Sequence, residues 1–228
     1  MVTLTATEAR DLVGGLSNTS KMPGLSMGLA AKYCNIGGKL RDVLGSVCNK
    51  CYAFKGMYVM PNVKEAHERR EAALYRIDWV PLMARAIARQ RWFRWHDSGD
   101  IRSLSHLIRI VAVAHLRPDV KFWIPTREYA VVTKYLASGA TFPKNLVVRM
   151  SAPMVGKSLP ARAGTSSMVL AKGATAPAGT YVCQASHTYK DGTKAETITK
   201  ENIVDLGHCG ACRACWSPNN LRTAYPIH

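Results

Sequence analysis

The seven cysteines of this chain are the residues best suited to chemistry, and they fall into two groups. The early group is Cys34, Cys48 and Cys51, and the late group is Cys183, Cys209, Cys212 and Cys215. The last three recur at every third position, a spacing that wraps one turn of backbone around a single inorganic core. Because a four-iron cluster takes one thiolate per iron, we expect the late group to bind a 4Fe-4S iron–sulfur cluster.

The early group supplies only three thiolates. A four-iron cluster bound there would keep one iron open to a small molecule or to an unusual ligand. The cysteines therefore predict one or two iron–sulfur clusters.

Zinc is the alternative metal, since it also uses paired C-x2-C motifs. A zinc site usually joins two separate pairs into a tetrahedron, and Cys215 is then one cysteine too many. A disulfide framework is disfavoured because the cysteine count is odd and no charged-then-apolar signal peptide opens the chain.

The charge balance favours a polyanionic partner. The 31 Lys and Arg residues against 15 Asp and Glu give a net charge of +16, and nucleic acid is the commonest partner of such a protein. The basic residues are densest at 67–76 and 85–94, where the alternative is a solvated helix face. No apolar stretch is long enough to cross a bilayer, so we expect no membrane partner and a cytoplasmic location, which suits reduced thiolates.

Strand and helix patterns alternate along the middle of the chain. After a polar lead-in over residues 1–20 and a loop without periodicity over 34–58, helices are expected at 61–74, 78–89, 103–116 and 128–137. Strands are expected at 22–31, 92–96, 121–124, 145–150, 166–170 and 180–183. This order predicts an α/β protein whose parallel sheet is an incomplete (βα) barrel. We place a barrel-like core with the early cysteine loop at 1–170 and a cysteine-rich, metal-binding extension, packed on that core, at 171–228.

Polar groups follow each of the first strands, and ligands of parallel α/β sheets bind beyond the carboxyl ends of the strands. His96 and Asp97 follow the second strand and could exchange protons with a substrate or bind it, or only cap the next helix. Arg127 follows the third strand and suits a carboxylate or a phosphate, or a salt bridge at the start of a helix. His96, Asp97 and Arg127 are therefore the candidate substrate-binding residues.

A three-cysteine loop after the first strand, with a Gly/acid turn after the second, resembles the radical S-adenosylmethionine superfamily. The resemblance implies a cubane on three cysteines whose open iron takes the amino and carboxylate groups of S-adenosylmethionine. Ser98 and Gly99 would then lie near the amino group. The chain has thirteen residues between Cys34 and Cys48, where that superfamily has three.

The segment 45–53, the turn at 96–100 and the closing stretch 209–216 together resemble the phage and mobile-element gene product 88 family. The similarity covers about residues 22–216, and it implies a cysteine-bound metal in a virus-borne protein of the host cytoplasm. We therefore expect an iron–sulfur cluster-binding phage-type protein of radical-enzyme-like ancestry, served by an electron donor. The alternatives are a radical S-adenosylmethionine enzyme acting on nucleic acid or another anionic substrate, and a zinc-binding, nucleic-acid-associated protein.

Overall fold

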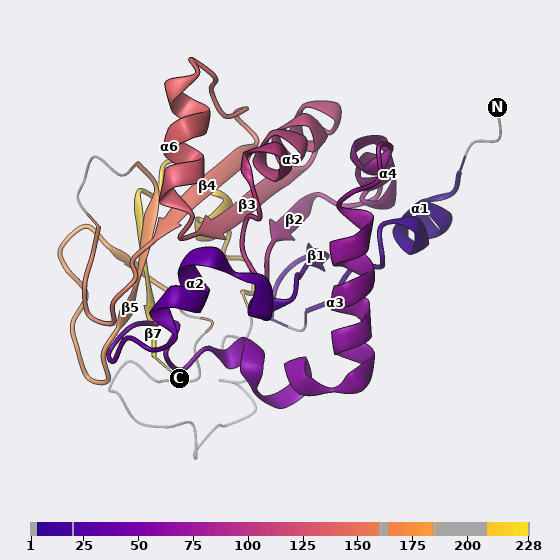
Figure 1. Ribbon diagram of the computed structural model, residues 1–228. Helices are drawn as coiled ribbons and strands as arrows, with labels where there is room; N and C mark the ends of the chain where they lie inside the picture. Colours follow the sequence, from indigo (N-terminus) through magenta and orange to yellow (C-terminus); the bar gives the residue numbers. More distant parts are fainter. Residues whose placement is uncertain (1–3, 20, 160–163, 184, 186–208, 228) are drawn as a thin grey trace.

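A single parallel sheet organises the chain in the computed structural model, which describes residues 4–19, 21–159, 164–183, 185 and 209–227 (Figure 1). The strands are β1 (Ser26–Met27), β2 (Trp92–Trp95), β3 (Lys121–Thr126), β4 (Leu146–Ser151), β5 (Ser166–Leu170), β6 (Tyr181–Val182) and β7 (Arg222–Pro226). Their order in the sheet is β1-β2-β3-β4-β5-β7-β6, and every neighbouring pair is parallel. The predicted parallel α/β class is confirmed.

The helices begin where their sequences carry start signals. They are α1 (Ala6–Leu12), α2 (Asn35–Leu40), α3 (Pro61–Ala73), α4 (Trp79–Ala86), α5 (Leu104–Leu116) and α6 (Tyr129–Ala137), with the short 3-10 turns η1 (Ala31–Tyr33), η2 (Tyr52–Phe54), η3 (Gly56–Val59) and η5 (Ala214–Trp216). Helix α5 starts at Ser103, whose hydroxyl accepts a hydrogen bond from the His106 N–H at 3.1 Å. Helix α3 starts with proline, which lacks the N–H that a first turn leaves unpaired. No helix in the described ranges is both long and apolar enough to span a bilayer.

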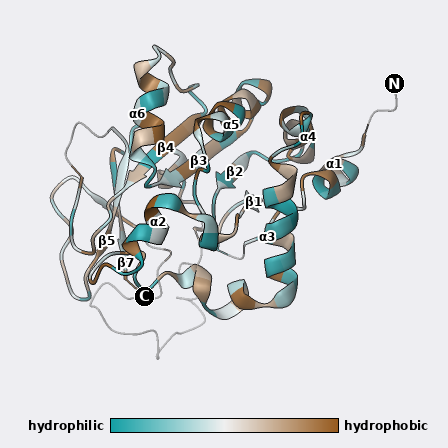
Figure 2. Cartoon of the chain, viewed as in Figure 1, coloured by the Kyte–Doolittle hydropathy of each residue, from teal (hydrophilic) through white to brown (hydrophobic). Residues whose placement is uncertain are grey.

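The two faces of the sheet are covered differently. Side chains alternate along a strand, so Phe93 and Trp95 enter the main hydrophobic core, where they lie with Trp79 of α4 and Leu107 of α5. In Figure 2, hydrophobic residues predominate in β3 and β4, whereas hydrophilic residues lie along α3. The opposite face receives Trp216 of η5, which donates a hydrogen bond from its indole N–H to the Phe93 carbonyl at 2.9 Å.

The predicted incomplete (βα) barrel is an open sheet that does not close into a ring. Strands β1 and β6 are its two edges and do not pair with each other. A closed barrel of this type surrounds its strands with helices, whereas the described residues after β4 contain no α-helix. The segments that join β4 to β7 therefore do not supply the outer layer that a ring requires.

Three further elements differ from the predictions. The expected polar lead-in forms α1, which a capping box of Thr5 and Glu8 starts and which buries Ala9. The loop expected at 34–58 contains α2, the 3-10 turn η2 and most of η3, and the strand expected at 22–31 shortens to two residues. Strand β7 was not predicted, and it pairs with both β5 and β6. The residues assigned to an extension therefore also complete the sheet.

Candidate cysteine sites

The early cysteine loop lies across the carboxyl ends of the central strands. The carboxylate of Glu128, just after β3, accepts a hydrogen bond at 3.0 Å from the N–H of Ile36 in the first turn of α2. The Val47 N–H donates to the Pro153 carbonyl, just after β4, at 2.8 Å. Two anchors thus hold the loop over the sheet edge where ligands of such folds bind.

The structure brings two of the three early thiols, those of Cys34 and Cys48, together. A Cβ added at Gly37 would lie 3.6 Å from the Cys48 sulfur and 3.7 Å from the Cys34 sulfur, so both sulfurs lie against the same glycine. Burial raises the pKa of Cys34 to about 12, with a smaller opposing effect of Arg102. Burial also raises the pKa of Cys48. A metal bound here would have to displace protons from these thiols.

The turn after β2 contains the most unusual backbone of the described chain. His96 has a φ of 56°, and no other described residue except glycine has a positive φ. Its side chain is 2% exposed, and neither ring nitrogen has a partner among the described residues. Burial lowers its pKa well below the ordinary value, so the imidazole is neutral. A strained, buried side chain with unused donors and acceptors is typical of functional sites.

The two carboxylates of this turn connect neighbouring strand ends. Asp97 accepts hydrogen bonds from the Ser26 hydroxyl at 2.9 Å and the Tyr58 hydroxyl at 3.2 Å. Asp100 accepts from the Thr126 hydroxyl at 2.6 Å and the Arg127 N–H at 2.9 Å. Burial raises the pKa of Asp100 to about 6, and these hydrogen bonds oppose the rise. Both side chains therefore hold β1, β2 and β3 in register at the site.

The remaining predicted binding residues lie in the same region. The Ser98 carbonyl accepts a hydrogen bond from the Leu29 N–H at 2.7 Å, while the Ser98 hydroxyl is buried and has no partner in the described ranges. Gly99 packs directly on Leu29. Arg127 donates from Nε to the Ala152 carbonyl at 3.3 Å. Their roles towards a cofactor or substrate stay predictions.

The late cysteines meet on the sheet face opposite the helices. The N–H of Cys183, just after β6, donates to the Ala224 carbonyl of β7 at 2.8 Å. Cys212 shares a hydrogen bond of 2.9 Å with the Tyr181 hydroxyl, and Cys215 shares one of 3.2 Å with the Tyr225 hydroxyl.

Burial is the main cause of the raised pKa values of Cys183, Cys209 and Cys215. It raises the pKa of Cys209 to about 11, and the nearby Cys183 and Cys212 add to the rise. It raises the pKa of Cys215 to about 11, with Cys183 adding to it. These mutual effects place the four predicted ligands in one neighbourhood.

Two arginines that sequence analysis missed complete the late site. Arg149 of β4 is fully buried and donates hydrogen bonds to the carbonyls of Ser166, Asn220 and Ala214, at 3.0 to 3.3 Å. Arg94 of β2 stacks on Trp123 with its guanidinium 4.6 Å from the ring centroid. Neither makes an ion pair within the described part of the chain.

Strand alternation is the signal that could have found Arg94. In the segment 92–95, phenylalanine and tryptophan at the second and fourth positions face the helices, so the arginine between them must point to the other side.

The described residues contain no group of three or more His, Cys, Asp or Glu side chains placed to hold one metal ion. A four-iron cluster distributes its thiolate ligands over four metal atoms, so a cluster site is wider than a site for one ion.

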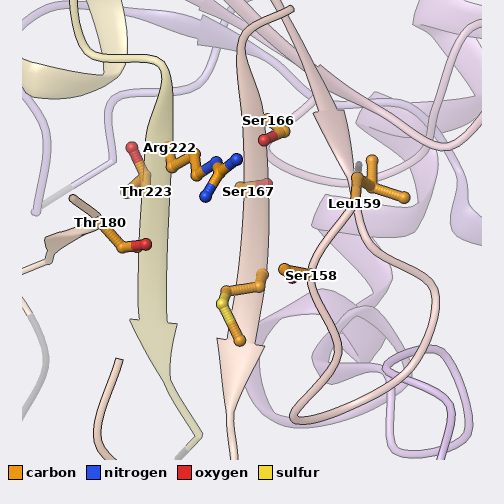
Figure 3. A pocket seen from close by; sticks show the side chains of 8 residues that line it. Ser158, Leu159, Ser166, Ser167, Thr180, Arg222 and Thr223 are labelled. Atoms are coloured by element: carbon orange, nitrogen blue, oxygen red, sulfur yellow. The ribbon is translucent and has the colours of Figure 1, made fainter. Parts of the chain in front are cut away.

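A small pocket lies between β5 and β7 (Figure 3). Its lining includes the hydroxyl residues Ser166, Ser167 and Thr223, together with Arg222. Its free space suits about one water molecule, which is too little for a substrate.

Comparisons with known proteins identify the family of the chain but no activity. No curated protein and no solved structure matches it. The resemblance to the radical S-adenosylmethionine superfamily receives no support from them. A family model described as gene product 88 matches residues 6–218, so the chain belongs to the gene product 88 family.

Proposed function

We propose that this protein binds a 4Fe-4S cluster through Cys183, Cys209, Cys212 and Cys215, and that the bound cluster serves one-electron chemistry. An electron donor in the cytoplasm, that of the host cell if a phage encodes the protein, would be its redox partner. The proposal builds on the four late thiols and on the charges that surround them.

The observation that carries the proposal is the pair of arginines beside these thiols. Arg149 is 0% exposed, and its described partners are backbone carbonyls rather than a carboxylate. A buried cation without a counter-ion is costly. A four-iron core bound by four thiolates is an anion, so it would neutralise the charge of Arg149 and Arg94.

The neighbouring side chains also suit a cluster. Tyr181 and Tyr225 place hydroxyl groups against the sulfurs of Cys212 and Cys215, and hydrogen bonds to sulfur tune such clusters. Trp216 is 4% exposed and covers the same face beside Trp92 and Trp123. An apolar cover of this kind limits the access of water.

Anaerobic purification, followed by iron and sulfide determination, tests the proposal. We expect a brown protein with at least four irons per chain, by the rule of one thiolate per iron. The Cys212→Ala variant should lose about one cluster, whereas Ser158→Ala, which removes a hydroxyl but no thiolate, should lose none. Stoichiometric zinc without iron would contradict the proposal and favour the zinc-binding alternative.

A second candidate function concerns the early thiols. Cys34, Cys48 and Cys51 belong to the loop that two hydrogen bonds hold over the carboxyl ends of β3 and β4. Tyr52, next to Cys51, donates a hydrogen bond to the Asp97 carbonyl in the turn after β2. We propose as the alternative that these three thiolates hold a cluster with one open iron that binds S-adenosylmethionine. His96, Asp97 and Arg127 would then contact an anionic substrate, and Ser98 and Gly99 the amino group of the cofactor.

The alternative is tested by a separate assay on the same anaerobically purified protein. Dithionite and S-adenosylmethionine should yield 5′-deoxyadenosine, and the Cys51→Ala variant should yield none while keeping its late cluster. If the triple alanine variant of the early cysteines contains as much iron as the parent protein, the early site does not exist.

A further inference from the structure

Most of the early cysteine loop forms an exposed surface that carries both apolar and basic side chains. Residues 39–60, which we name the platform, run from the end of α2 through η2 and η3. Seven of the large hydrophobic side chains that the described chain exposes belong to it: Val43, Leu44, Tyr52, Phe54, Met57, Val59 and Met60. Leu44 is 87% exposed and Met57 is 68% exposed. Exposed apolar side chains gathered in one segment mark an interaction surface.

The backbone of the platform is held in place, so the exposure of its side chains belongs to a defined surface. The Asn49 side chain donates to the Arg41 carbonyl at 2.7 Å, and the Val155 N–H donates to the Gly45 carbonyl at 3.0 Å. The Tyr52 hydroxyl donates to the Asp97 carbonyl. The platform is therefore fixed both to itself and to the strand ends.

The charge of the platform is positive. Lys39, Arg41, Lys50 and Lys55 stand against the single acidic residue Asp42. None of the four cations makes an ion pair with a carboxylate within the described chain. A partner with a regular negative charge would complement this surface.

Aromatic rings lie among these cations. The Arg41 guanidinium lies 4.1 Å from the centroid of the Phe54 ring, and the Tyr52 and Tyr58 rings are 5.4 Å apart. Tyr52 is 55% exposed. Cations that contact phosphates and aromatic faces that stack on bases are the combination that binds single-stranded nucleic acid. In a duplex the bases are stacked on one another, so their faces cannot stack on these rings.

From this combination we propose that the platform binds single-stranded nucleic acid. Phosphates pair with Lys50 and Lys55, and a base stacks on the exposed part of Phe54. The bound strand passes over the early cysteines, next to the turn after β2. The binding depends on the cations and aromatic rings of the platform and not on the cluster proposed at Cys183, Cys209, Cys212 and Cys215, so the two proposals can fail separately.

Two double charge-reversal variants test whether the nucleic acid binds at the platform. The first variant combines Lys50→Glu and Lys55→Glu, and the second combines Lys134→Glu and Lys144→Glu. Both change the net charge equally, but the second pair lies on α6 and in the segment after it. Figure 1 shows α6 on the opposite side of the molecule from the segment between α2 and α3.

Fluorescence anisotropy with a labelled 20-nucleotide single strand of mixed sequence measures affinity at several salt concentrations. The platform variant should bind at least about tenfold more weakly, and its salt dependence should be shallower because fewer phosphates are neutralised. The α6 variant should stay within about twofold of the parent protein, on the same principle.

An aromatic substitution tests the stacking independently of charge. Phe54→Leu should weaken binding by about tenfold at every salt concentration, since it removes a base stack and no charge. Phe54→Tyr keeps the ring and should retain binding.

Three outcomes would overturn the proposal. They are no measurable binding to single strands of DNA or RNA, equal losses in the two paired variants, and equal affinity for poly-glutamate or for vesicles of anionic lipid. Circular dichroism of each variant establishes that it is folded before its affinity is compared.

Discussion

Burial decides the charge of two histidines beside the turn after β2. His96 and His106 have ring centroids 5.4 Å apart, and both side chains are at least nine-tenths buried. Burial, together with smaller effects of the nearby Arg102 and Arg109, lowers the pKa of His106 to about 3. In mild acid, both imidazoles therefore stay neutral in the folded protein, whereas they would be protonated in the unfolded chain.

The first prediction concerns stability in mild acid. The pKa of His106 is lower in the folded protein than in the unfolded chain. Its contribution to the free energy of unfolding is therefore complete above about pH 6.5 and is lost as the pH falls towards 3. Between pH 7 and pH 5 the free energy of unfolding should fall by about 2 kcal/mol on account of this residue. The variant His106→Asn should lose less on the same change of pH, as measured by urea unfolding.

The matched control is His115→Asn, because His115 is exposed on the same helix. Asp100 acts in the opposite direction, since its raised pKa of about 6 makes the folded state gain a proton over part of the same range. Because every variant keeps Asp100, its contribution cancels when the pH-induced change in one variant is compared with the change in another. Equal pH dependence in His106→Asn and His115→Asn would show that His106 does not set the acid limit.

At the scale of elements, the turn after β2 depends on a glycine that contacts the chain after β1. Gly99 has a φ of 80°, and a Cβ there would lie 2.7 Å from the Leu29 Cβ and 2.8 Å from the Leu29 carbonyl oxygen. Gly139, at the end of α6, has a φ of 79° but no atom within 4 Å of the same position. The two glycines share one backbone conformation and differ only in their surroundings.

The second prediction follows from this pair. Gly139→Ala should cost about 1 kcal/mol, the strain of a left-handed backbone. Gly99→Ala adds an overpacked contact and should cost about 3 kcal/mol or more in total. Urea unfolding of both variants measures the difference. Equal losses of unfolding free energy would mean that the turn after β2 can move to accommodate the added methyl group.

The sequence allowed several elements to be predicted because their signals are local. Ser103 caps α5, a proline opens α3, and the alternation at 166–170 gave β5 with its observed bounds. Strand β7 was missed because it is defined by its neighbours β5 and β6 rather than by its own pattern. Helix α1 did carry a signal, the capping box of Thr5 and Glu8, which the polar composition of its surroundings obscured.

The candidate sites likewise contain residues that local sequence patterns predict and residues that they do not. Cysteine spacing predicted two groups of thiols, and strand ends predicted the cluster of polar groups that contains His96 and Asp97. Arg149 could not be predicted because its role depends on carbonyls of a segment more than sixty residues away. Side chains that act on distant backbone leave no local pattern.

For the molecule as a whole, charge opposes folding at low salt. The net charge is +16, and the described chain contains four ion pairs, of which only the Arg102–Glu71 pair is well buried at both ends. Repulsion among the unpaired cations therefore outweighs the attraction that salt would screen.

The third prediction is that sodium chloride stabilises this protein. Raising its concentration from 50 to 300 mM should raise the Tm by roughly 3 °C, equivalent to about 1 kcal/mol for a chain of this size. Differential scanning fluorimetry measures the shift, and an equal osmolality of sucrose separates screening from solute exclusion. A Tm that falls as sodium chloride is added would show that the ion pairs matter more than the net charge.

The place of β7 between β5 and β6 has a consequence for protein synthesis. Strands β1 to β5 can pair in the order in which the ribosome releases them, but β6 emerges before the strand that it pairs with. Until residues 222–226 are released, the nascent chain carries β5 with one edge unpaired, and such an edge can pair with another chain. Strand β7 is therefore the strand that covers this edge of β5 during synthesis.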